Sequence, residues 1–95
     1  MDTSTAYLRL TRELAREIRD ATTAAYRQPD LGRDGWNINT EKAARIATKL
    51  LRGEWPERSA ILVDYNTCAA INGRAIVEAV IRSGVTIDCQ VTLRY

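Results

Sequence analysis

Residues 72–74 combine three residue types that suit a turn able to receive an anion. Asn72 can cap the start of a helix, Gly73 can adopt a backbone conformation that other residues avoid, and Arg74 has a positive charge. A glycine at a helix start lets a phosphate approach amide groups that already point outward. The same residues also suit an ordinary strand-to-helix turn without a ligand, because Asn and Gly favour such turns in any case. Asn72, Gly73 and Arg74 are our candidate site for an anion or nucleic acid, with a plain capped turn as the alternative.

The chain contains no histidine, which removes the commonest general base near neutral pH and every Ser-His-Asp or Cys-His nucleophile. An enzyme would have to use carboxylates, Lys42 or Lys49, tyrosines, a thiol or a metal held by oxygens. Asp64 and Asp88 are weak candidates for a pair of metal ligands, because we expect Asp64 at the end of a strand and Asp88 on a solvent-exposed face. We predict no catalytic residue, no metal site and no cofactor.

The two cysteines, Cys68 and Cys89, lie in apolar contexts typical of strands, which predicts buried, reduced thiols. A disulfide stays open, because both residues could lie on neighbouring strands. No apolar run is long enough to cross a bilayer, and residues 1–4 resemble no export signal. We therefore expect a cytoplasmic protein without a membrane partner.

Charge alone does not single out a nucleic-acid binder. The net charge is +2, from 14 basic and 12 acidic residues. Arginine outnumbers lysine 12 to 2. A GC-rich genome explains this better than phosphate recognition does, because the arginines are interleaved with Glu and Asp rather than clustered. Five arginines could still form a basic surface around the turn: Arg33, Arg45, Arg52, Arg74 and Arg82.

Residues 4–27 are predicted to form one long amphipathic helix, because their apolar residues recur at spacings of three and four. At 1.5 Å per residue it would be roughly 35 Å long, longer than the remaining domain needs. One interpretation is a core helix; the other is an interface for a second copy or a partner helix. The candidate interface residues are Tyr7, Leu10, Leu14 and Ile18.

The remaining chain predicts alternating helices and strands. A loop over residues 28–39 separates an N-terminal extension, residues 1–28, from a domain over residues 37–95. Caps, glycines and apolar patterns then predict a helix from Asn39 or Thr40 to Gly53, strands over 60–63 and 68–71, a helix from Asn72 to Gly84 and a strand over 85–95. The last strand alternates cleanly between apolar and polar residues. We expect an α+β fold with a mixed sheet.

The order of these elements resembles the ParB-like/sulfiredoxin superfamily, and most closely the ParB-like proteins common in phages of actinobacteria. The matching stretches are Asn39 to Trp55, Ile61 to Asp64, Ile71 to Arg74 and Ser83 to Ile87. The resemblance covers residues 37–95 and implies a small domain with a helix, a two-strand unit, a second helix and a long final strand. The N-terminal helix lies outside it.

In that family the turn binds phosphate groups through backbone amides and an arginine, and sulfiredoxins have a catalytic cysteine there. Ile71 and Gly73 match the family pattern, and no cysteine lies in the turn. Four other positions differ from the family in residue type: Asn72, Arg74, Ala75 and Ile76. The resemblance therefore implies a fold that has kept its glycine but lost most polar groups of the active turn.

Three functions follow as hypotheses. The first is a small non-catalytic protein of ParB-like fold, from a phage or mobile element, that binds a host protein or forms a homodimer through its N-terminal helix or its sheet face. The second is a nucleic-acid or nucleotide-binding module that uses the turn at residues 72–74. The third is a ParB-like nuclease or nucleotide hydrolase. The lost polar groups and the added helix favour the first.

Overall fold

The computed structural model describes residues 3–26, 36, 38–54 and 60–95. Over these residues it contains three helices and one four-stranded mixed sheet, so the predicted α+β class is confirmed. In chain order the elements are β1 (Thr3–Leu10), α1 (Arg12–Ala25), α2 (Thr40–Leu51), β2 (Ala60–Asp64), β3 (Ala70–Asn72), α3 (Arg74–Ser83) and β4 (Ile87–Arg94).

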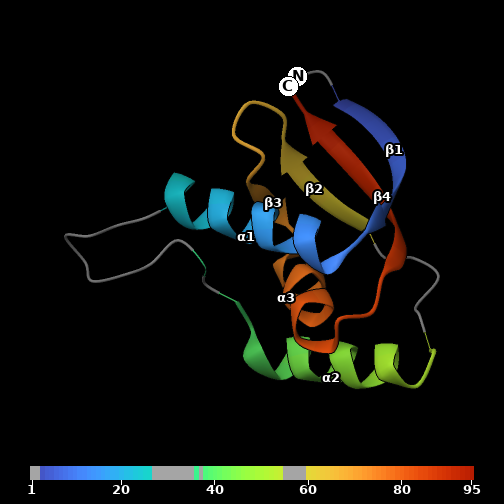
Figure 1. Cartoon of the computed structure of the whole chain (residues 1–95). Helices are drawn as coiled ribbons and strands as arrows, with labels where there is room; N and C mark the ends of the chain where they lie inside the picture. Colours follow the sequence, from blue (N-terminus) through green and yellow to red (C-terminus); the bar gives the residue numbers. More distant parts are fainter. Residues whose placement is uncertain (1–2, 27–35, 37, 55–59) are drawn as a thin grey trace.

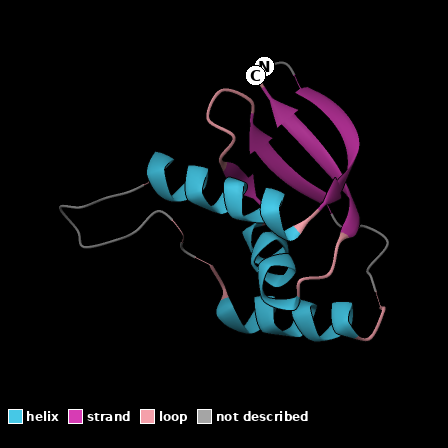
Figure 2. Ribbon diagram, in the orientation of Figure 1, coloured by secondary structure: helices cyan, strands magenta, loops and turns pink. Residues whose placement is uncertain are grey.

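The sheet has the order β1-β4-β2-β3, with β4 antiparallel to β1 and parallel to β2, and β3 antiparallel to β2 (Figure 1). The alternation predicted for the last strand is confirmed: Ile87, Cys89 and Val91 are buried, whereas Asp88 is exposed. Because successive side chains of a strand point to opposite faces, this alternation directs one face of the sheet toward the core. The three helices close that core, and α3 lies between α1 and α2 and packs against both (Figure 2).

The predicted single helix over residues 4–27 is wrong in its first third, which forms β1. Thr and Tyr favour strands, and every residue from Thr3 to Leu10 is paired with β4. Thr11 then begins α1, because its hydroxyl accepts a hydrogen bond from the Leu14 amide at 3.1 Å. The spacing of three between Tyr7 and Leu10 therefore places them on opposite faces of a strand.

The four candidate interface residues consequently do not share one exposed stripe. Leu10 and Ile18 are buried in the core, Leu14 is partly buried against it, and Tyr7 is 78% exposed. The residues predicted as a separate extension share a sheet and a core with those predicted as the domain over 37–95. The expected end of the helix at Pro29 lies outside the described residues.

Thr22 joins α1 to the sheet and was not singled out by the sequence. Its buried hydroxyl donates a hydrogen bond to the Ile18 carbonyl at 2.6 Å and accepts one from the Ala70 amide at 2.8 Å. The hydroxyl therefore provides a hydrogen-bond acceptor for the first amide of β3. This short strand needs one, because it pairs with a neighbouring strand, β2, on only one side. This bond places β3, and the turn that follows it, relative to α1.

The two cysteines lie in different environments, which corrects the prediction that both are buried. Cys89 is buried on β4, and burial raises the pKa of its thiol. Cys68 is exposed in the turn before β3 and has a φ of +63°. The two thiols are not bonded to each other. The strand predicted from residue 68 starts only at Ala70, because a residue in the left-handed region cannot continue a strand.

Candidate anion site at the start of α3

Gly73 is the residue on which the β3–α3 turn depends. It occupies the N-cap position of α3 with a φ of +86°. A Cβ at this position would lie 2.6 Å from Ile61 Cγ2 and 3.1 Å from the Ala60 carbonyl oxygen. Glycine is thus required both for the left-handed backbone and for the close approach of β2. The predicted strand–turn–helix unit around Gly73 is present.

Asn72 does not cap the helix, which corrects the prediction. It is the last residue of β3, and its side-chain oxygen accepts a hydrogen bond from the neighbouring Gly73 amide at 2.9 Å. The left-handed glycine takes the cap position instead, and no side chain caps α3. Among the described residues, the Arg74 and Ala75 amides have no hydrogen-bond partner. These two amides are open donors at the positive end of the helix.

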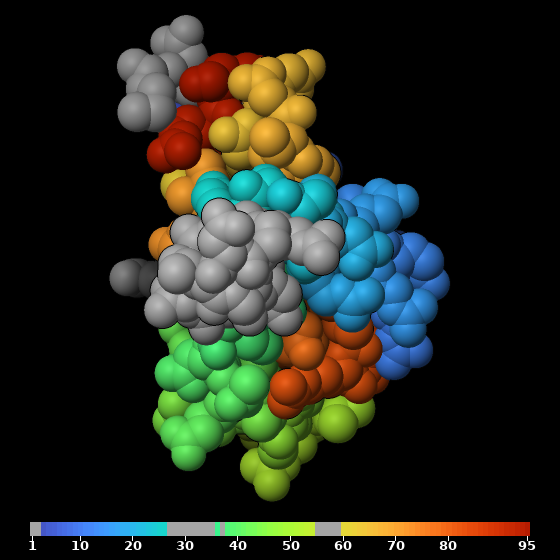
Figure 3. Space-filling model, turned by 90° about the vertical axis from the view of Figure 1, so that its left-hand side faces the viewer, coloured from blue at the N-terminus to red at the C-terminus, as the bar shows by residue number. Residues whose placement is uncertain are grey.

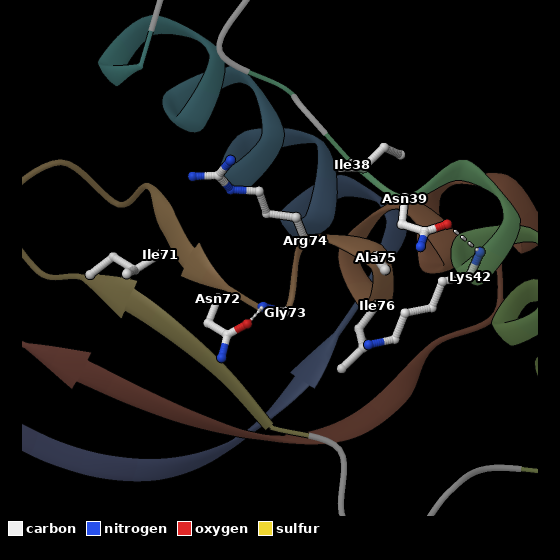
Figure 4. A pocket seen from close by; sticks show the side chains of 9 residues that line it. All are labelled: Ile38, Asn39, Lys42, Ile71, Asn72, Gly73, Arg74, Ala75 and Ile76. Atoms are coloured by element: carbon white, nitrogen blue, oxygen red, sulfur yellow. Dashed lines mark hydrogen bonds between the residues drawn. The ribbon is translucent and has the colours of Figure 1, made fainter.

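Arg74 contributes its backbone to this site, but its guanidinium group turns away. Its Nε donates a hydrogen bond to the Ala70 carbonyl at 3.0 Å, and its guanidinium carbon lies 4.9 Å from the ring centre of Tyr26. Figure 4 shows the side chain directed toward α1. The expectation that the Arg74 charge meets an anion at the turn therefore does not fit the observed rotamer.

Lys42, which the sequence did not connect with the turn, supplies a charge there instead. A cavity of about 320 Å³ lies between the β3–α3 turn and the start of α2. Asn39 and Lys42 line it from α2, and residues 71–76 line it from the turn. In Figure 4 the Lys42 side chain extends from α2 toward the start of α3. Lys42 is exposed and forms no ion pair within the described part of the chain.

The starts of two helices thus border one cavity. Each helix N-terminus contributes a partial positive charge, and Lys42 adds a full one. The described residues that line the cavity include no carboxylate, so nothing among them repels an anion. Amide donors, helix termini and an ammonium group are the features that bind phosphate in proteins.

A stripe of basic side chains continues from Lys42 along the exposed face of α2. Its members are separated by three or four residues, so they lie on one face of the helix. The stripe, named here the α2 basic stripe, consists of Lys42, Arg45, Lys49 and Arg52, all exposed. The opposite face of α2 buries Ala43, Ala47 and Leu50. Figure 3 shows α2, in green, at the surface of the lower part of the molecule.

The α2 basic stripe has the character of a binding surface in two further respects. A shallow hollow of about 330 Å³ lies along it, lined in part by Arg45, Lys49 and Arg52. None of its members forms an ion pair with another described residue. Arg82, by contrast, is bound to Glu78 at 3.2 Å, so it does not join the basic surface predicted around the turn. Arg33 lies outside the described residues.

The two aspartates considered as a metal pair lie far apart. Asp64 accepts hydrogen bonds from the Asn66 and Thr67 amides at 2.8 and 3.3 Å and is paired with Arg94 in the sheet. Asp88 lies six residues away on β4, or about 20 Å along the strand. Within the described ranges, no three His, Cys, Asp or Glu residues gather as metal ligands.

Comparison with known proteins found no matching family model, no matching curated protein and no matching solved structure. The ParB-like/sulfiredoxin resemblance therefore stays a prediction. None of the described helices has the length and apolar character that a membrane span requires.

Proposed function

We propose that this protein binds a nucleic-acid strand by its phosphate groups and does not transform it. The observation that supports this most is the cavity in which the uncapped start of α3 faces Lys42. One phosphate in this cavity would receive hydrogen bonds from the Arg74 and Ala75 amides and a charge contact from Lys42. Gly73 leaves the approach to these amides open, because it has no side chain.

The α2 basic stripe favours a polymer over a single nucleotide. Neighbouring members of the stripe lie about 5–6 Å apart at their Cβ atoms, as residues three or four apart on a helix do. A strand anchored by one phosphate in the cavity could therefore place further phosphates along Arg45, Lys49 and Arg52. A mononucleotide would fill the cavity alone, and the exposed charges of the α2 basic stripe would then have no ligand.

Binding without turnover is proposed because the described cavity lining lacks groups for catalysis. Among the described residues that line the cavity, Lys42 is the only one whose charged side-chain group extends toward the start of α3. An ammonium group at this place is suited to neutralise the charge of a phosphate. The nuclease or nucleotide hydrolase hypothesis would need a general base or a metal at this position. The hypothesis of a protein partner on the N-terminal stripe is weakened, because Leu10 and Ile18 are buried.

The experiment is a titration of a fluorescent single-stranded oligonucleotide and of its duplex, followed by anisotropy between low and physiological salt. For four phosphate contacts on a single strand, log K should fall with log salt with a slope of about −3. Lys42→Gln should weaken binding and make this slope shallower by about 1. Arg16→Gln is the matched control, because Arg16 is exposed on α1 and does not line the cavity, and the substitution also removes one positive charge.

The outcomes separate the alternatives. Binding that is equal in the Lys42→Gln and Arg16→Gln variants would refute the cavity as the anchor. Triple replacement of Arg45, Lys49 and Arg52 by Gln should abolish most oligonucleotide binding. If that triple variant binds as the wild type does, while a nucleoside triphosphate competes fully, the ligand is a mononucleotide. Release of nucleotides from the oligonucleotide, with or without divalent metal, would replace binding by nuclease activity.

A further inference from the structure

The outer edge of β1 has no partner in the described structure. β1 lies at the end of the sheet, where β4 is its only neighbouring strand, and no described helix packs extensively against it (Figure 1). Of its eight residues only Leu10 is buried. The N–H and C=O groups of alternate residues along such an edge point away from the sheet and can pair with another strand.

This edge has few of the features that normally prevent pairing. Proteins protect edge strands by proline, charged side chains, bulges or short length. β1 is eight residues long, contains no proline, and is paired with β4 without a register shift. It has a single charged residue, Arg9, which lies 3.9 Å from Asp88 with both side chains exposed. The opposite edge, β3, has three residues, and the register shifts between Leu62 and Val63.

Two large apolar side chains on β1 are left exposed. Tyr7 is 78% exposed on the face that points away from the core, and Leu8 is 43% exposed on the other face. A strand added along the edge would contact both, because cross-strand neighbours lie about 5 Å apart on each face of a sheet. The edge therefore gains apolar contact as well as backbone hydrogen bonds when it is paired.

The sequence of β1 is complementary to itself in the antiparallel direction. In a register centred on Tyr7, Tyr7 lies opposite its symmetry mate, Ala6 lies opposite Leu8, and Thr5 lies opposite Arg9. No two like charges meet, and aromatic or aliphatic groups meet on each face. One two-fold axis uses both β1 edges, so the assembly closes and leaves only the short β3 edges outside.

We infer that two copies of this protein form a symmetric dimer by antiparallel pairing of β1 with β1, which joins the two sheets into one. This inference does not depend on the proposed nucleic-acid binding, because the α2 basic stripe and β1 consist of different residues. A second copy, rather than a foreign peptide, is the occupant that the self-complementary sequence and the closed symmetry favour.

The test is the mass of the protein in solution, measured by light scattering or sedimentation over a range of concentrations. The wild type should reach twice the chain mass of 10.7 kDa. Tyr7→Lys should give a monomer of unchanged circular dichroism, because it places two ammonium groups opposite each other on the axis; we expect the dissociation constant to rise about tenfold or more. Leu51→Lys is the control, since Leu51 is 68% exposed on α2 and should leave the dimer intact.

A second measurement keeps the inference testable if Tyr7→Lys does not fold. Tyr7→Cys, made together with Cys68→Ser to remove the exposed native thiol, should form a disulfide between copies under mild oxidation. Opposed residues in an antiparallel pair have Cα atoms about 4.5–5.5 Å apart, within the range that a disulfide spans. Leu51→Cys in the same background should not form one. A wild type that stays monomeric at its highest soluble concentration, forms larger assemblies, or keeps its dimer in Tyr7→Lys would overturn the proposed dimer.

Discussion

Helices α2 and α3 begin within one cavity, but their first turns are completed differently. Asn39 caps α2 by accepting a hydrogen bond from the Lys42 amide at 3.0 Å, whereas α3 begins at a left-handed glycine and has no side-chain cap. A side-chain cap supplies a hydrogen-bond acceptor to a free amide in the first turn of a helix. An uncapped helix start has no such acceptor. Of the two, the start of α3 is therefore suited to bind a ligand, and the start of α2 is suited to position Lys42.

The largest expected effect is that of Gly73→Ala, which should destabilise the protein by about 2–5 kcal/mol. The left-handed backbone costs an L-residue about 1–2 kcal/mol, and the contact with Ile61 adds an overpacking term of about 1–3 kcal/mol. Urea denaturation followed by circular dichroism measures the loss. Gly53→Ala is the matched control: its φ is +74°, but nothing lies within 4 Å of the added Cβ. Equal losses in the two variants would show that β2 does not crowd the α3 start.

A smaller loss, about 1 kcal/mol, is expected for Asn39→Ala, because it removes the cap of α2. Asn72→Ala should cost less, since the Asn72 side chain bonds to an exposed amide outside the helix and caps nothing. Both values follow from the same urea titrations. If Asn72→Ala proved the more damaging, the assignment of capped and uncapped helix starts would have to be exchanged.

The smallest expected effect is the stabilisation of the folded protein by inorganic phosphate, which probes the Arg74 and Ala75 amides. At a phosphate concentration equal to the dissociation constant, binding stabilises the folded state by about 0.4 kcal/mol. For a domain of this size that raises the midpoint of thermal unfolding by roughly 2–3 °C. Phosphate also stabilises proteins without binding a site, so the readout is the difference between wild type and Lys42→Gln at equal ionic strength. Identical shifts in the two proteins would remove the cavity as an anion site.

The sequence predicts most of the fold after residue 38, because its signals there are local. Asn39 as a cap, Gly53 and Gly84 in the left-handed region, and the alternation of β4 each depend on residues close along the chain. β1 could not be recognised in this way. Its apolar spacing fits a helix, and the strand that stabilises it is 77 or more positions away, with Leu10 paired to Ile87.

The candidate site was predicted in part for the same reason. The turn at Gly73 follows from its residue types, and the structure contains it. The direction of Arg74 does not follow, because Tyr26 and the Ala70 carbonyl that hold it are brought near only by the packing of α1 against β3. The position of Lys42 at the cavity depends likewise on the packing of α2 against α3. The spacing of the α2 basic stripe was visible in the sequence and could have been found there.

The position of β4 has a consequence for synthesis on the ribosome. β4 is the only described strand that touches both β1 and β2, yet it is the last of the four to be translated. At ordinary elongation rates β1 waits on the order of 10 s before its neighbour leaves the tunnel. During that interval the helices of the nascent chain can pack, but the strand that lies between β1 and β2 is missing. Tyr7 and Leu8 therefore remain accessible to chaperones or to neighbouring nascent chains.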